Sequence, residues 1–403
     1  MAKVCVIGLG YIGLPTAVVL AKAGHSTLGI DIDPHVVKNV NNGVTHFREP
    51  NLNSSLISVV SNGMLRASEK IKDADIFIIA VPTPFRKTNN KNPVPNLDYV
   101  ISAINSILPF IRKGNSIVIE STCPIGTTAK VKNIIIENTK LKENDFNLAY
   151  CPERVIPGNI MVELINNDRV IGSHNNQSKE KIINFYKTFC KGNILSTTAE
   201  TAEMVKLTEN SFRDVNIAFA NELSIISDHI NIDVIELIKL ANFHPRVNIL
   251  KPGCGVGGHC IAVDPWFIAS EVPEKSQLIQ TARKINDYKP QWVIEKITKK
   301  ARELKSTLRK DPIIGCLGIT FKPNVDDLRE SPALKIVQGL DKTQLKLIVA
   351  DPNIKSHNEL SISPLNNLIN NSDLYVFLVA HNEFKYISLK NREYLDFCGV
   401  INK

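Results

Sequence analysis

The sequence predicts an α/β protein made of two doubly wound parallel-sheet domains joined by a long central helix. The first third of the chain alternates short apolar runs with longer amphipathic segments, and this alternation resumes from about residue 311. Strands that alternate with helices are joined by crossovers, which make the strands parallel and cover both faces of the sheet. Between the two regions, residues 198–229 contain neither Pro nor Gly, which predicts one long helix.

The expected elements follow one another along the chain. The N-terminal region predicts a helix over 13–23 and strands over 3–8, 26–31, 76–81 and 115–120. The C-terminal region predicts a helix after Ser331 and strands over 313–319, 345–350 and 374–380. We therefore expect three domains, which are a dinucleotide-binding domain over 1–197, a central helical domain over 198–300 and a second parallel-sheet domain over 301–403.

The composition excludes several classes of protein. The 403 residues are 43% hydrophobic and 22% charged, which is ordinary for a folded chain and argues against extensive disorder. The net charge of +8 is spread along the sequence. It suits small anionic ligands better than nucleic acid, which needs a clustered basic face, and a charge that serves solubility alone is the alternative.

Signals for membranes and export are also lacking in the sequence. No run of 18 consecutive apolar residues occurs, so we expect no spanning helix. The N-terminus becomes a strand within a few residues and does not show the order of a signal peptide. The eight cysteines lie far apart, unlike those of a secreted disulfide framework. We expect reduced thiols, a cytoplasmic location, and neither a membrane nor a nucleic-acid partner.

A glycine-rich turn follows the first predicted strand and opens the first predicted helix. Gly8 allows a tight turn, Gly10 lets the backbone approach a pyrophosphate, and Gly13 lets helix and strand pack closely. Asp31 ends the second predicted strand, where a carboxylate accepts hydrogen bonds from ribose hydroxyls and repels a 2′-phosphate. The pattern predicts a Rossmann-like site for NAD in preference to NADP. FAD is one alternative, and a glycine turn of an unrelated α/β protein is another.

A second glycine-rich segment carries a candidate nucleophile. Four glycines between residues 253 and 258 fit a loop that wraps a ligand closely. Cys260 follows at a predicted helix start, a position that lowers the pKa of a thiol, and Asp264 would share its helical face. The alternative is a buried cysteine that serves packing only, which is our expectation for Cys5, Cys316 and Cys398. Zinc is not predicted, because no second ligand pair accompanies Cys254, His259 and Cys260.

The predicted long helix carries a polar stripe. Lys206 and Asn210 are four residues apart, and Arg213 follows one turn later. A lysine and an amide together can hold an alkoxide or polarise a carbonyl. Taken alone, an ordinary solvated helix face is the simpler reading of these three residues.

Together these motifs resemble the UDP-glucose/GDP-mannose dehydrogenase family, whose NAD-dependent members oxidise the sugar of a nucleotide sugar to a uronic acid. The resemblance runs along almost the whole chain and rests on residues 8–15, 81–84, 121–128, 151–158, 203–210, 257–265, 318–322 and 327–332. The residues around the cysteine, 244–250 and 262–267, are most similar to the branch that acts on UDP-N-acetyl-D-mannosamine. The chain stops at Lys403, close to where family members complete a last strand.

The resemblance implies a four-electron oxidation of the sugar C6 alcohol that uses two NAD molecules in turn. The thiolate of Cys260 would attack the intermediate aldehyde, the second oxidation would give a thioester, and water would release the acid. Covalent capture would keep the aldehyde from diffusing away between the two oxidations. The catalytic set that the resemblance implies is Cys260 as nucleophile, Lys206 and Asn210 at the oxyanion, Asp264 and Glu153 for water and protons, and Thr122 for positioning water.

The resemblance also implies binding residues and a partner. The cofactor residues are Gly8, Gly10, Tyr11, Ile12, Gly13, Asp31, Thr83, Thr122 and Arg329. The substrate residues are Arg154, Val155, Lys206, Asn210, Arg213, Arg246, Gly257, Phe321 and Lys322. The long helix would pair two subunits, with Arg246 reaching into the neighbour's site, so we expect a homodimer or a multiple of one.

Other functions remain open at this point. UDP-glucose and UDP-N-acetylglucosamine differ from UDP-N-acetylmannosamine at C2 of the sugar, and few residues that read C2 can be named from sequence. A two-electron hydroxyacid dehydrogenase would share the fold and the lysine–asparagine helix but would need no cysteine. A nucleotide-binding protein without turnover is the third alternative, and the joint presence of Lys206, Asn210, Cys260 and Asp264 argues against it.

Overall fold

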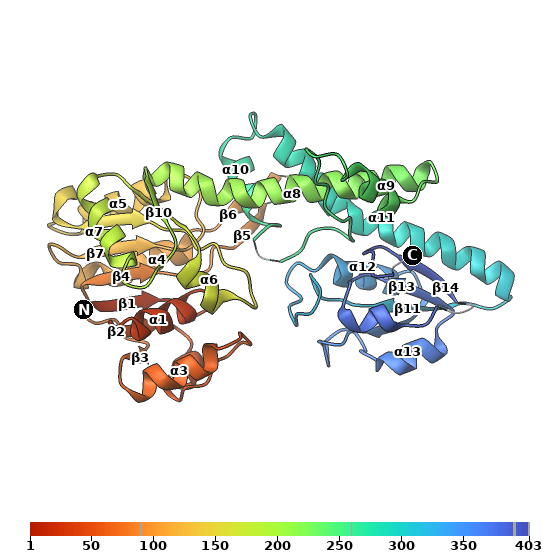
Figure 1. Ribbon diagram of the computed structural model, residues 1–403, viewed down its shortest axis with the longest axis horizontal. Helices are drawn as coiled ribbons and strands as arrows, with labels where there is room; N and C mark the ends of the chain where they lie inside the picture. Colours follow the sequence, from red (N-terminus) through yellow and green to blue (C-terminus); the bar gives the residue numbers. More distant parts are fainter. Residues whose placement is uncertain (89–90, 259, 390–391, 402–403) are drawn as a thin grey trace. The chain divides into compact units, whose positions relative to one another are not determined.

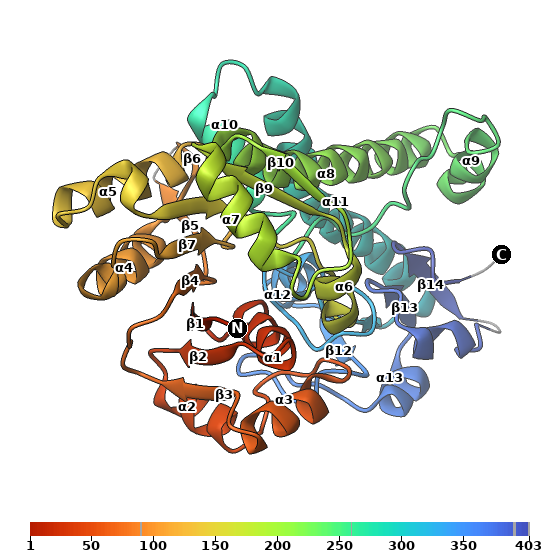
Figure 2. The same cartoon turned by 60° about the vertical axis from the view of Figure 1, so that its left-hand side comes forward.

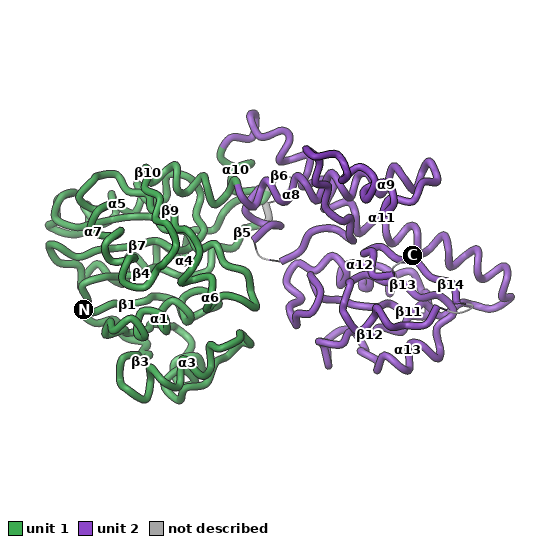
Figure 3. The backbone as a smooth tube through the Cα atoms, in the orientation of Figure 1, with its two compact units in different colours: residues 1–208, 266–271 green, residues 209–265, 272–403 purple. Residues whose placement is uncertain are grey.

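The chain folds as an α/β protein in two units, which confirms the predicted fold class (Figure 3). The computed structural model describes residues 1–88, 91–258, 260–389 and 392–401. Unit 1 contains residues 1–208 and 266–271, and unit 2 contains residues 209–265 and 272–403. His259, which was considered above as a zinc ligand, lies outside the described residues.

The main sheet of unit 1 has the strand order β10-β9-β8-β7-β4-β1-β2-β3 (Figure 1). Its strands are β1 (Lys3–Ile7), β2 (Ser26–Ile30), β3 (Leu65–Ser68), β4 (Ile76–Ile79), β7 (Ser116–Ile119), β8 (Asn147–Tyr150), β9 (Arg169–Ser173) and β10 (Ile194–Thr197). Neighbouring strands are parallel except β8 and β9, which run antiparallel. The strand order reverses between β1 and β4, and such a switch point opens a ligand crevice at the carboxyl ends of the strands.

Alternating side chains of these strands build two apolar layers. Val4 and Val6 of β1 face one layer, and Cys5 and Ile7 face the other. The first layer is completed by α1 (Gly13–Lys22), α3 (Leu52–Ser61), α6 (Ile160–Asn166) and α7 (Asn176–Tyr186). The second is completed by α4 (Asp98–Ile107) and α5 (Thr127–Asn138). Because both faces are covered, the central strands β1, β4 and β7 are mostly apolar, as the sequence indicated.

Three smaller elements complete unit 1. Helix α2 (Pro34–Asn41) follows β2 (Figure 2). Its N-cap residue, Asp33, accepts a hydrogen bond from the His35 amide at 2.8 Å. The strands β5 (Phe85–Thr88) and β6 (Lys91–Pro95) form a separate antiparallel pair.

Helix α8 (Ala199–His229) confirms the long helix predicted over 198–229. The remaining helices are α9 (Val234–Ala241), α10 (Asp264–Glu271), α11 (Gln277–Leu308), α12 (Pro332–Asp341) and α13 (Leu365–Asn371). The long helix α11 was not predicted from sequence, because its apolar positions form only a narrow stripe in a strongly polar segment. In the part of the chain that the structure describes, no helix is long and apolar enough to cross a membrane.

The sheet of unit 2 has the order β12-β11-β13-β14 and is parallel throughout. Its strands are β11 (Ile313–Leu317), β12 (Lys346–Ala350), β13 (Leu374–Phe377) and β14 (Glu393–Asp396). One face packs on α11 and α12, and the other packs on α13 and on Phe384. The last strand, β14, pairs with β13 from Leu374↔Glu393 to Phe377↔Asp396 and forms one edge of the sheet.

Within unit 1, a buried carboxylate joins the first turns of α8 to the N-terminus of α5. Glu203 is fully buried, and it accepts hydrogen bonds from the amides of Gly126 at 2.6 Å and Thr128 at 2.7 Å. The Thr128 hydroxyl donates a third bond at 2.6 Å. The N-terminal amides of a helix lack partners within the helix, so a carboxylate there satisfies them and opposes the helix dipole. Burial raises the pKa of Glu203, and these three donors offset part of that effect.

We predict that Glu203→Ala lowers the thermal midpoint by about 2–8 °C, because three buried donors lose their acceptor. Scanning calorimetry measures the shift. The matched control is Glu137→Ala on the exposed side of α5, which should change the midpoint by less than about 2 °C. Equal shifts in the two variants would contradict the capping role.

Candidate functional site

The carboxyl edge of the unit 1 sheet gathers the predicted cofactor residues. Gly8 follows β1, Asp31 follows β2, Thr83 lies beyond β4, and Thr122 lies beyond β7. Parallel strands end at one edge, so loops far apart in sequence become neighbours there. The loop 151–155 follows β8 at the same edge and carries Glu153.

The glycine turn has the geometry that a dinucleotide needs. Gly8 has φ +92°, and an added Cβ would lie 2.6 Å from the Ala80 carbonyl oxygen. An added Cβ at Gly13 would lie 1.8 Å from the Gly8 oxygen, so only glycine allows α1 to approach β1 this closely. Gly10 is exposed, and its added Cβ would meet no described atom within 4 Å, which leaves open space over the backbone. The turn therefore fits a pyrophosphate at the N-terminus of α1, which carries no side-chain cap.

Asp31, which is predicted to bind the ribose, also supports this turn. Its Oδ2 accepts a hydrogen bond from the Leu9 amide at 2.9 Å, and its Oδ1 accepts one from the Asp33 amide at 3.0 Å. Nearby, the ring of Tyr11 stacks on Phe47 with 4.3 Å between the centroids. The carboxylate thus fixes the glycine turn against the end of β2, a structural role that the sequence did not indicate.

Glu153 belongs to a buried ion pair. Its Oε2 accepts a hydrogen bond from the Arg169 guanidinium at 2.6 Å, and its Oε1 accepts one from the Arg154 amide at 2.8 Å. Arg169 lies in β9, and it also donates to the Leu164 carbonyl at 2.8 Å. Since a buried carboxylate without a partner is costly, the ion pair with Arg169 offsets the cost of burying Glu153 at this position.

A second buried carboxylate lies beside this pair. Glu120 accepts hydrogen bonds from the Tyr186 hydroxyl at 2.6 Å and from the Thr16 hydroxyl at 3.3 Å. Burial, and then repulsion from Glu153, raise the pKa of Glu120 to about 7, although Arg169 and the two hydroxyls act in the opposite direction. Glu120 thus holds a proton over the range in which an exposed glutamate is ionised.

The other predicted residues of unit 1 have separate environments. The Arg154 guanidinium donates to the Asp168 carbonyl at 3.3 Å, and Val155 packs against the apolar layer that contains α6. Thr122 and Thr83 are half-buried. Lys206 is half-buried on α8, one turn before Asn210.

In unit 2, the structure brings two predicted catalytic residues into contact. Asn210 is buried, and its Nδ2 donates to Asp264 Oδ2 at 2.5 Å. Cys260 is half-buried, and its carbonyl oxygen accepts from the Asp264 amide at 2.8 Å. Helix α10 begins at Asp264, so the prediction that Cys260 starts a helix is wrong by one turn. The reason is that residues 260–263 form a turn with a helix-like bond to Asp264 before the regular helix begins.

All eight cysteines are described, and they are thiols with no disulfide between them. Burial raises the pKa of Cys5 and Cys316 to about 12, so these two are unreactive core residues, as predicted. Cys398 lies after β14 and is half-buried, and it packs against the apolar layer that contains α13, where burial raises the pKa of its thiol, as the packing role predicts. The described residues contain no cluster of His, Cys, Asp and Glu arranged to hold a metal ion.

The cysteine loop packs against the loop that follows β11. An added Cβ at Gly257 would lie 2.8 Å from Phe321 Cβ and 2.8 Å from the Glu330 carbonyl oxygen. The Gly258 amide donates to the Arg329 carbonyl at 2.9 Å. Glycine is required at these two positions because the backbone of the cysteine loop lies close to the loop that follows β11. Within unit 2, this contact joins the loop of the predicted nucleophile to the loop that is predicted to bind the nucleotide sugar.

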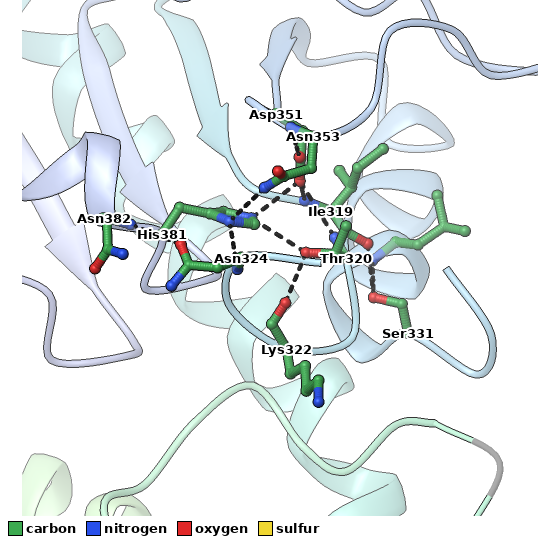
Figure 4. A network of polar contacts seen from close by, with 10 residues as sticks. Ile319, Thr320, Lys322, Asn324, Ser331, Asp351, Asn353, His381 and Asn382 are labelled. Carbon is green, nitrogen blue, oxygen red and sulfur yellow. Dashed lines mark hydrogen bonds and ion pairs between the residues drawn. The ribbon is translucent and has the colours of Figure 1, made fainter. Parts of the chain in front are cut away.

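Figure 4 shows the polar network that holds the loop after β11. His381, which follows β13, is fully buried. Its Nδ1 accepts from the Asn324 amide at 3.0 Å, and because an amide can only donate, the ring hydrogen is on Nε2. Nε2 faces Asp351 Oδ2 at 3.2 Å and the Thr320 hydroxyl at 3.1 Å. The loop that carries Phe321 is therefore fixed to the ends of both neighbouring strands.

Asp351 is the charged member of this network. It also accepts hydrogen bonds from the amides of Ile319 at 2.8 Å and Asn353 at 2.8 Å. Burial alone would raise the pKa of Asp351, but His381 and these amides lower it overall.

The predicted cationic residues of unit 2 differ in their surroundings. The Lys322 ammonium lies 5.6 Å from the centroid of the Phe321 ring. Arg213 and Arg246 are exposed. Arg329, predicted to contact the cofactor, pairs its guanidinium with Asp327 at 2.6 Å.

Sequence reasoning missed the residues that hold these groups in place, which are Glu120, Arg169, Glu203, Asp351 and His381. Glu120 and Arg169 lie inside or at the end of apolar strands. A polar residue within an apolar run is itself a signal, because it needs a buried partner. The identity of that partner depends on which strands become neighbours, which the local pattern does not contain.

Comparison with known proteins places the chain among nucleotide-sugar dehydrogenases. The chain matches three domains of the UDP-glucose/GDP-mannose dehydrogenase family, which are the NAD binding domain over 2–190, the central domain over 200–288 and the UDP binding domain over 315–401. The UDP-N-acetyl-D-mannosamine dehydrogenase of Campylobacter jejuni is 47% identical, with 98% of this chain and 99% of that protein covered.

Two further relatives are similar over their full length. The NDP-N-acetyl-D-galactosaminuronic acid dehydrogenase of Ralstonia nicotianae is 44% identical, with 98% of this chain and 96% of that protein covered. The solved structure of a UDP-D-ManNAc dehydrogenase from Pyrococcus horikoshii superposes with a TM-score of 0.91 at 37% identity, with 100% of this chain and 96% of that chain covered.

The raised pKa of Glu120 predicts a pH dependence of stability. Between about pH 4.5 and 7 the folded protein keeps the proton of Glu120 while the unfolded chain loses it, so this group stabilises the fold less as the pH rises. Glu120→Gln stays neutral, so its thermal midpoint relative to wild type should rise from pH 4.5 to 7 and level off above 7. Thermal unfolding of both proteins across pH 4–8 measures the difference, and parallel curves would contradict the raised pKa.

Proposed function

Because the chain belongs to the UDP-glucose/GDP-mannose dehydrogenase family, we propose that it oxidises the C6 alcohol of UDP-N-acetyl-D-mannosamine to the uronate in an NAD-dependent four-electron reaction. The observation that carries this proposal is the constellation of Cys260, Asp264 and Asn210 around one glycine-rich loop. The choice of sugar is supported by the names of relatives that are similar over their full length.

The cofactor residues fit NAD. Gly10 offers the open backbone for the pyrophosphate, Gly8 and Gly13 shape the turn, and Asp31 is placed at the end of β2 for the ribose. Ile12, Tyr11, Thr83 and Thr122 would line the same edge of the sheet, and Arg329 is the remaining proposed contact. When bound, NAD supplies the hydride acceptor for the C6 carbon.

The thiol of Cys260 supplies the covalent step. Its sulfur forms a bond to the aldehyde carbon, and the carbonyl oxygen takes up the proton to give a thiohemiacetal. After the second oxidation the carbon is a thioester, and water adds to it. The C–S bond then breaks, which releases the uronic acid and restores the thiol.

We propose that neighbouring side chains assist these reaction steps. Asn210 is oriented by its bond to Asp264, and with Lys206 one helical turn before it we propose that it stabilises the oxyanion. We propose that Asp264, which holds Asn210, also orients water. Glu153, held by Arg169, and Thr122 complete the proposed water and proton handling.

We propose that two loops and five cationic side chains hold the substrate. Gly257 and Phe321 lie against each other, and Lys322 is the cation nearest to them in sequence. The remaining proposed contacts are Lys206, Asn210, Arg154, Val155, Arg213 and Arg246. Arginine and lysine suit the diphosphate of a nucleotide sugar.

The domain organisation that we propose has three parts, over 1–197, 198–300 and 301–403. The three family matches, which begin at residues 2, 200 and 315, support this division. We also propose a cytoplasmic location, since the reaction needs Cys260 as a thiol and the cytoplasm keeps thiols reduced.

We propose that α8 pairs two subunits. Phe212, Phe219 and Ile226 are exposed at intervals of seven residues, which places them along one side of the helix. Ile230, Ile232 and Leu240 extend the exposed apolar surface to α9. Such a contiguous apolar surface is typical of a protein–protein interface.

The oligomer has a direct test. Light scattering should give twice 44.8 kDa or a higher multiple, and Phe219→Glu should shift the protein towards monomer because it buries a charge in the interface. Ile57→Glu on α3, also an exposed apolar position, should leave the mass unchanged. A wild-type mass of one chain at micromolar concentration would exclude the dimer.

One relative supports a second candidate substrate. The Ralstonia protein is named for an N-acetyl-D-galactosaminuronic acid product, and its identity to this chain, 44%, is close to that of the mannosamine enzymes. A panel of UDP-N-acetylmannosamine, UDP-N-acetylgalactosamine, UDP-N-acetylglucosamine and UDP-glucose, followed by NADH absorbance, separates these candidates. Two NADH per uronate supports the four-electron reaction, whereas one supports a hydroxyacid-type dehydrogenase.

We predict that Cys260→Ser lowers uronate formation by a factor on the order of 10² or more, because serine is a poor nucleophile unless a base activates it. Binding of NAD and of the UDP-sugar, measured by calorimetry, should survive. Cys398→Ser, at the other half-buried cysteine, is the control and should keep its rate. Normal uronate formation by Cys260→Ser would remove this residue from the mechanism.

A further inference from the structure

The loop that carries Cys260 is attached to α8 at both of its ends. At one end, Asn221 Oδ1 accepts a hydrogen bond from the Gly253 amide at 2.9 Å. At the other end, Asn210 Nδ2 donates to Asp264 Oδ2 at 2.5 Å. The two asparagines are eleven residues apart, which is close to three helical turns, so they project from one side of the helix.

The orientation of the Asn221 amide is determined by its neighbours. The side chain is fully buried, and its Nδ2 donates to Asn286 Oδ1 at 2.9 Å. Asn286 in turn donates to Asp214 Oδ1 at 2.8 Å, and this oxygen also accepts from the Arg283 guanidinium at 2.7 Å. Asn286 Nδ2 also donates to the Asp214 backbone carbonyl at 3.0 Å, an oxygen that can only accept. Asn286 must therefore present its side-chain oxygen to Asn221, and Asn221 must present its own to Gly253.

The first residues of the loop are also held by their surroundings. Gly255 has φ +131°, and an added Cβ would lie 3.0 Å from the Asn286 carbonyl oxygen. The buried Cys254 thiol donates to the Leu378 carbonyl at 3.3 Å. These contacts fix the position of the backbone over residues 253–255. Asn221 is the side chain that attaches this backbone to α8.

We propose that Asn221 is a positioning residue for Cys260, acting through the Gly253 amide. This inference rests on the proposed role of Cys260 as nucleophile. Asn221 has the same task at the start of the loop that Asn210 has at its end, so α8 sets the distance between the two attachment points. A nucleophile that is misplaced by about 1 Å can cost on the order of 10² in rate, which is why a remote hydrogen bond matters for the reaction.

Two substitutions of Asn221 separate the effect of its side-chain shape from the effect of its hydrogen bond to Gly253. Leucine has nearly the shape of asparagine but accepts no hydrogen bond, whereas aspartate has that shape and keeps the acceptor for Gly253. If Asn221 only fills space between helices, the two replacements should affect catalysis alike. If it positions the loop, the leucine variant should be the impaired one.

The test compares Asn221→Leu with Asn221→Asp well below the melting temperature of each. For Asn221→Leu we expect kcat to fall by about tenfold or more while KM for UDP-N-acetyl-D-mannosamine changes less than about threefold. Asn221→Asp should keep kcat within about threefold of wild type. Asn138→Ala, at an exposed asparagine of α5 whose side-chain amide donates to the Ile134 carbonyl at 2.9 Å, is the control and should match wild type.

A second measurement is independent of turnover. Alkylation of Cys260 by iodoacetamide, resolved by mass spectrometry, should become at least about threefold faster in Asn221→Leu and stay near the wild-type rate in Asn221→Asp. Cys398 in the same samples is the internal reference and should not change. If wild type oxidises none of the UDP-sugars, the proposed function fails, and the alkylation rates still decide whether Asn221 positions the loop.

Two outcomes would overturn the proposal. One is wild-type kcat together with wild-type Cys260 alkylation in folded Asn221→Leu, and the other is equal impairment of the leucine and aspartate variants. If Asn221→Leu does not fold, Asn221→Gln takes its place, because the longer side chain displaces the acceptor while keeping a polar group. It should then show the same loss of kcat and the same faster alkylation, and wild-type values in it would equally overturn the role of Asn221.

Discussion

The common direction of the parallel strands is the constraint on which both candidate binding regions depend. In unit 1, the loops after β1, β2, β4, β7 and β8 leave the sheet at one edge, which brings the glycine turn, Asp31, Thr122 and Glu153 to the same side. In unit 2, the ends of β11, β12 and β13 meet in the same way around His381. Crossover connections make these strands parallel, so loops that lie far apart in sequence converge at one edge in each unit.

Buried polar side chains then hold the converging loops in one conformation. Arg169 holds Glu153, Glu203 closes the N-terminus of α5, and Asp351 holds the loop that carries Phe321. Each of these groups would be costly to bury alone and is stabilised only when its partner is in one position. The hydrogen bonds offset the free-energy cost of burying these side chains, and they also restrict the conformations of the loops.

The cysteine loop shows how a flexible sequence becomes a defined structure. Its glycines have no side chains to anchor them, and they let the backbone pass close to Phe321 and Asn286. The anchoring comes instead from asparagines of α8 at either end of the loop, Asn221 and Asn210. Helix α8 thus carries the amide of the proposed oxyanion site and spaces the loop that presents the thiol, and it also carries the exposed apolar residues that we propose pair two subunits.

The sequence alone determined the α/β class, the long helix over 198–229 and the glycine turn, because alternation, helix propensity and glycine spacing are local properties. It also indicated the candidate residues Cys260, Lys206 and Asn210, because each lies in a short motif that can be recognised from the sequence alone. It placed the start of α10 one turn too early and missed α11, whose apolar stripe is narrow.

Only the tertiary structure decided the partners of the buried groups. Glu153 and Arg169 are sixteen residues apart, and Asn221 and Gly253 are thirty-two apart. Such pairs form because strand order and helix packing bring distant segments together, and no local pattern encodes that proximity.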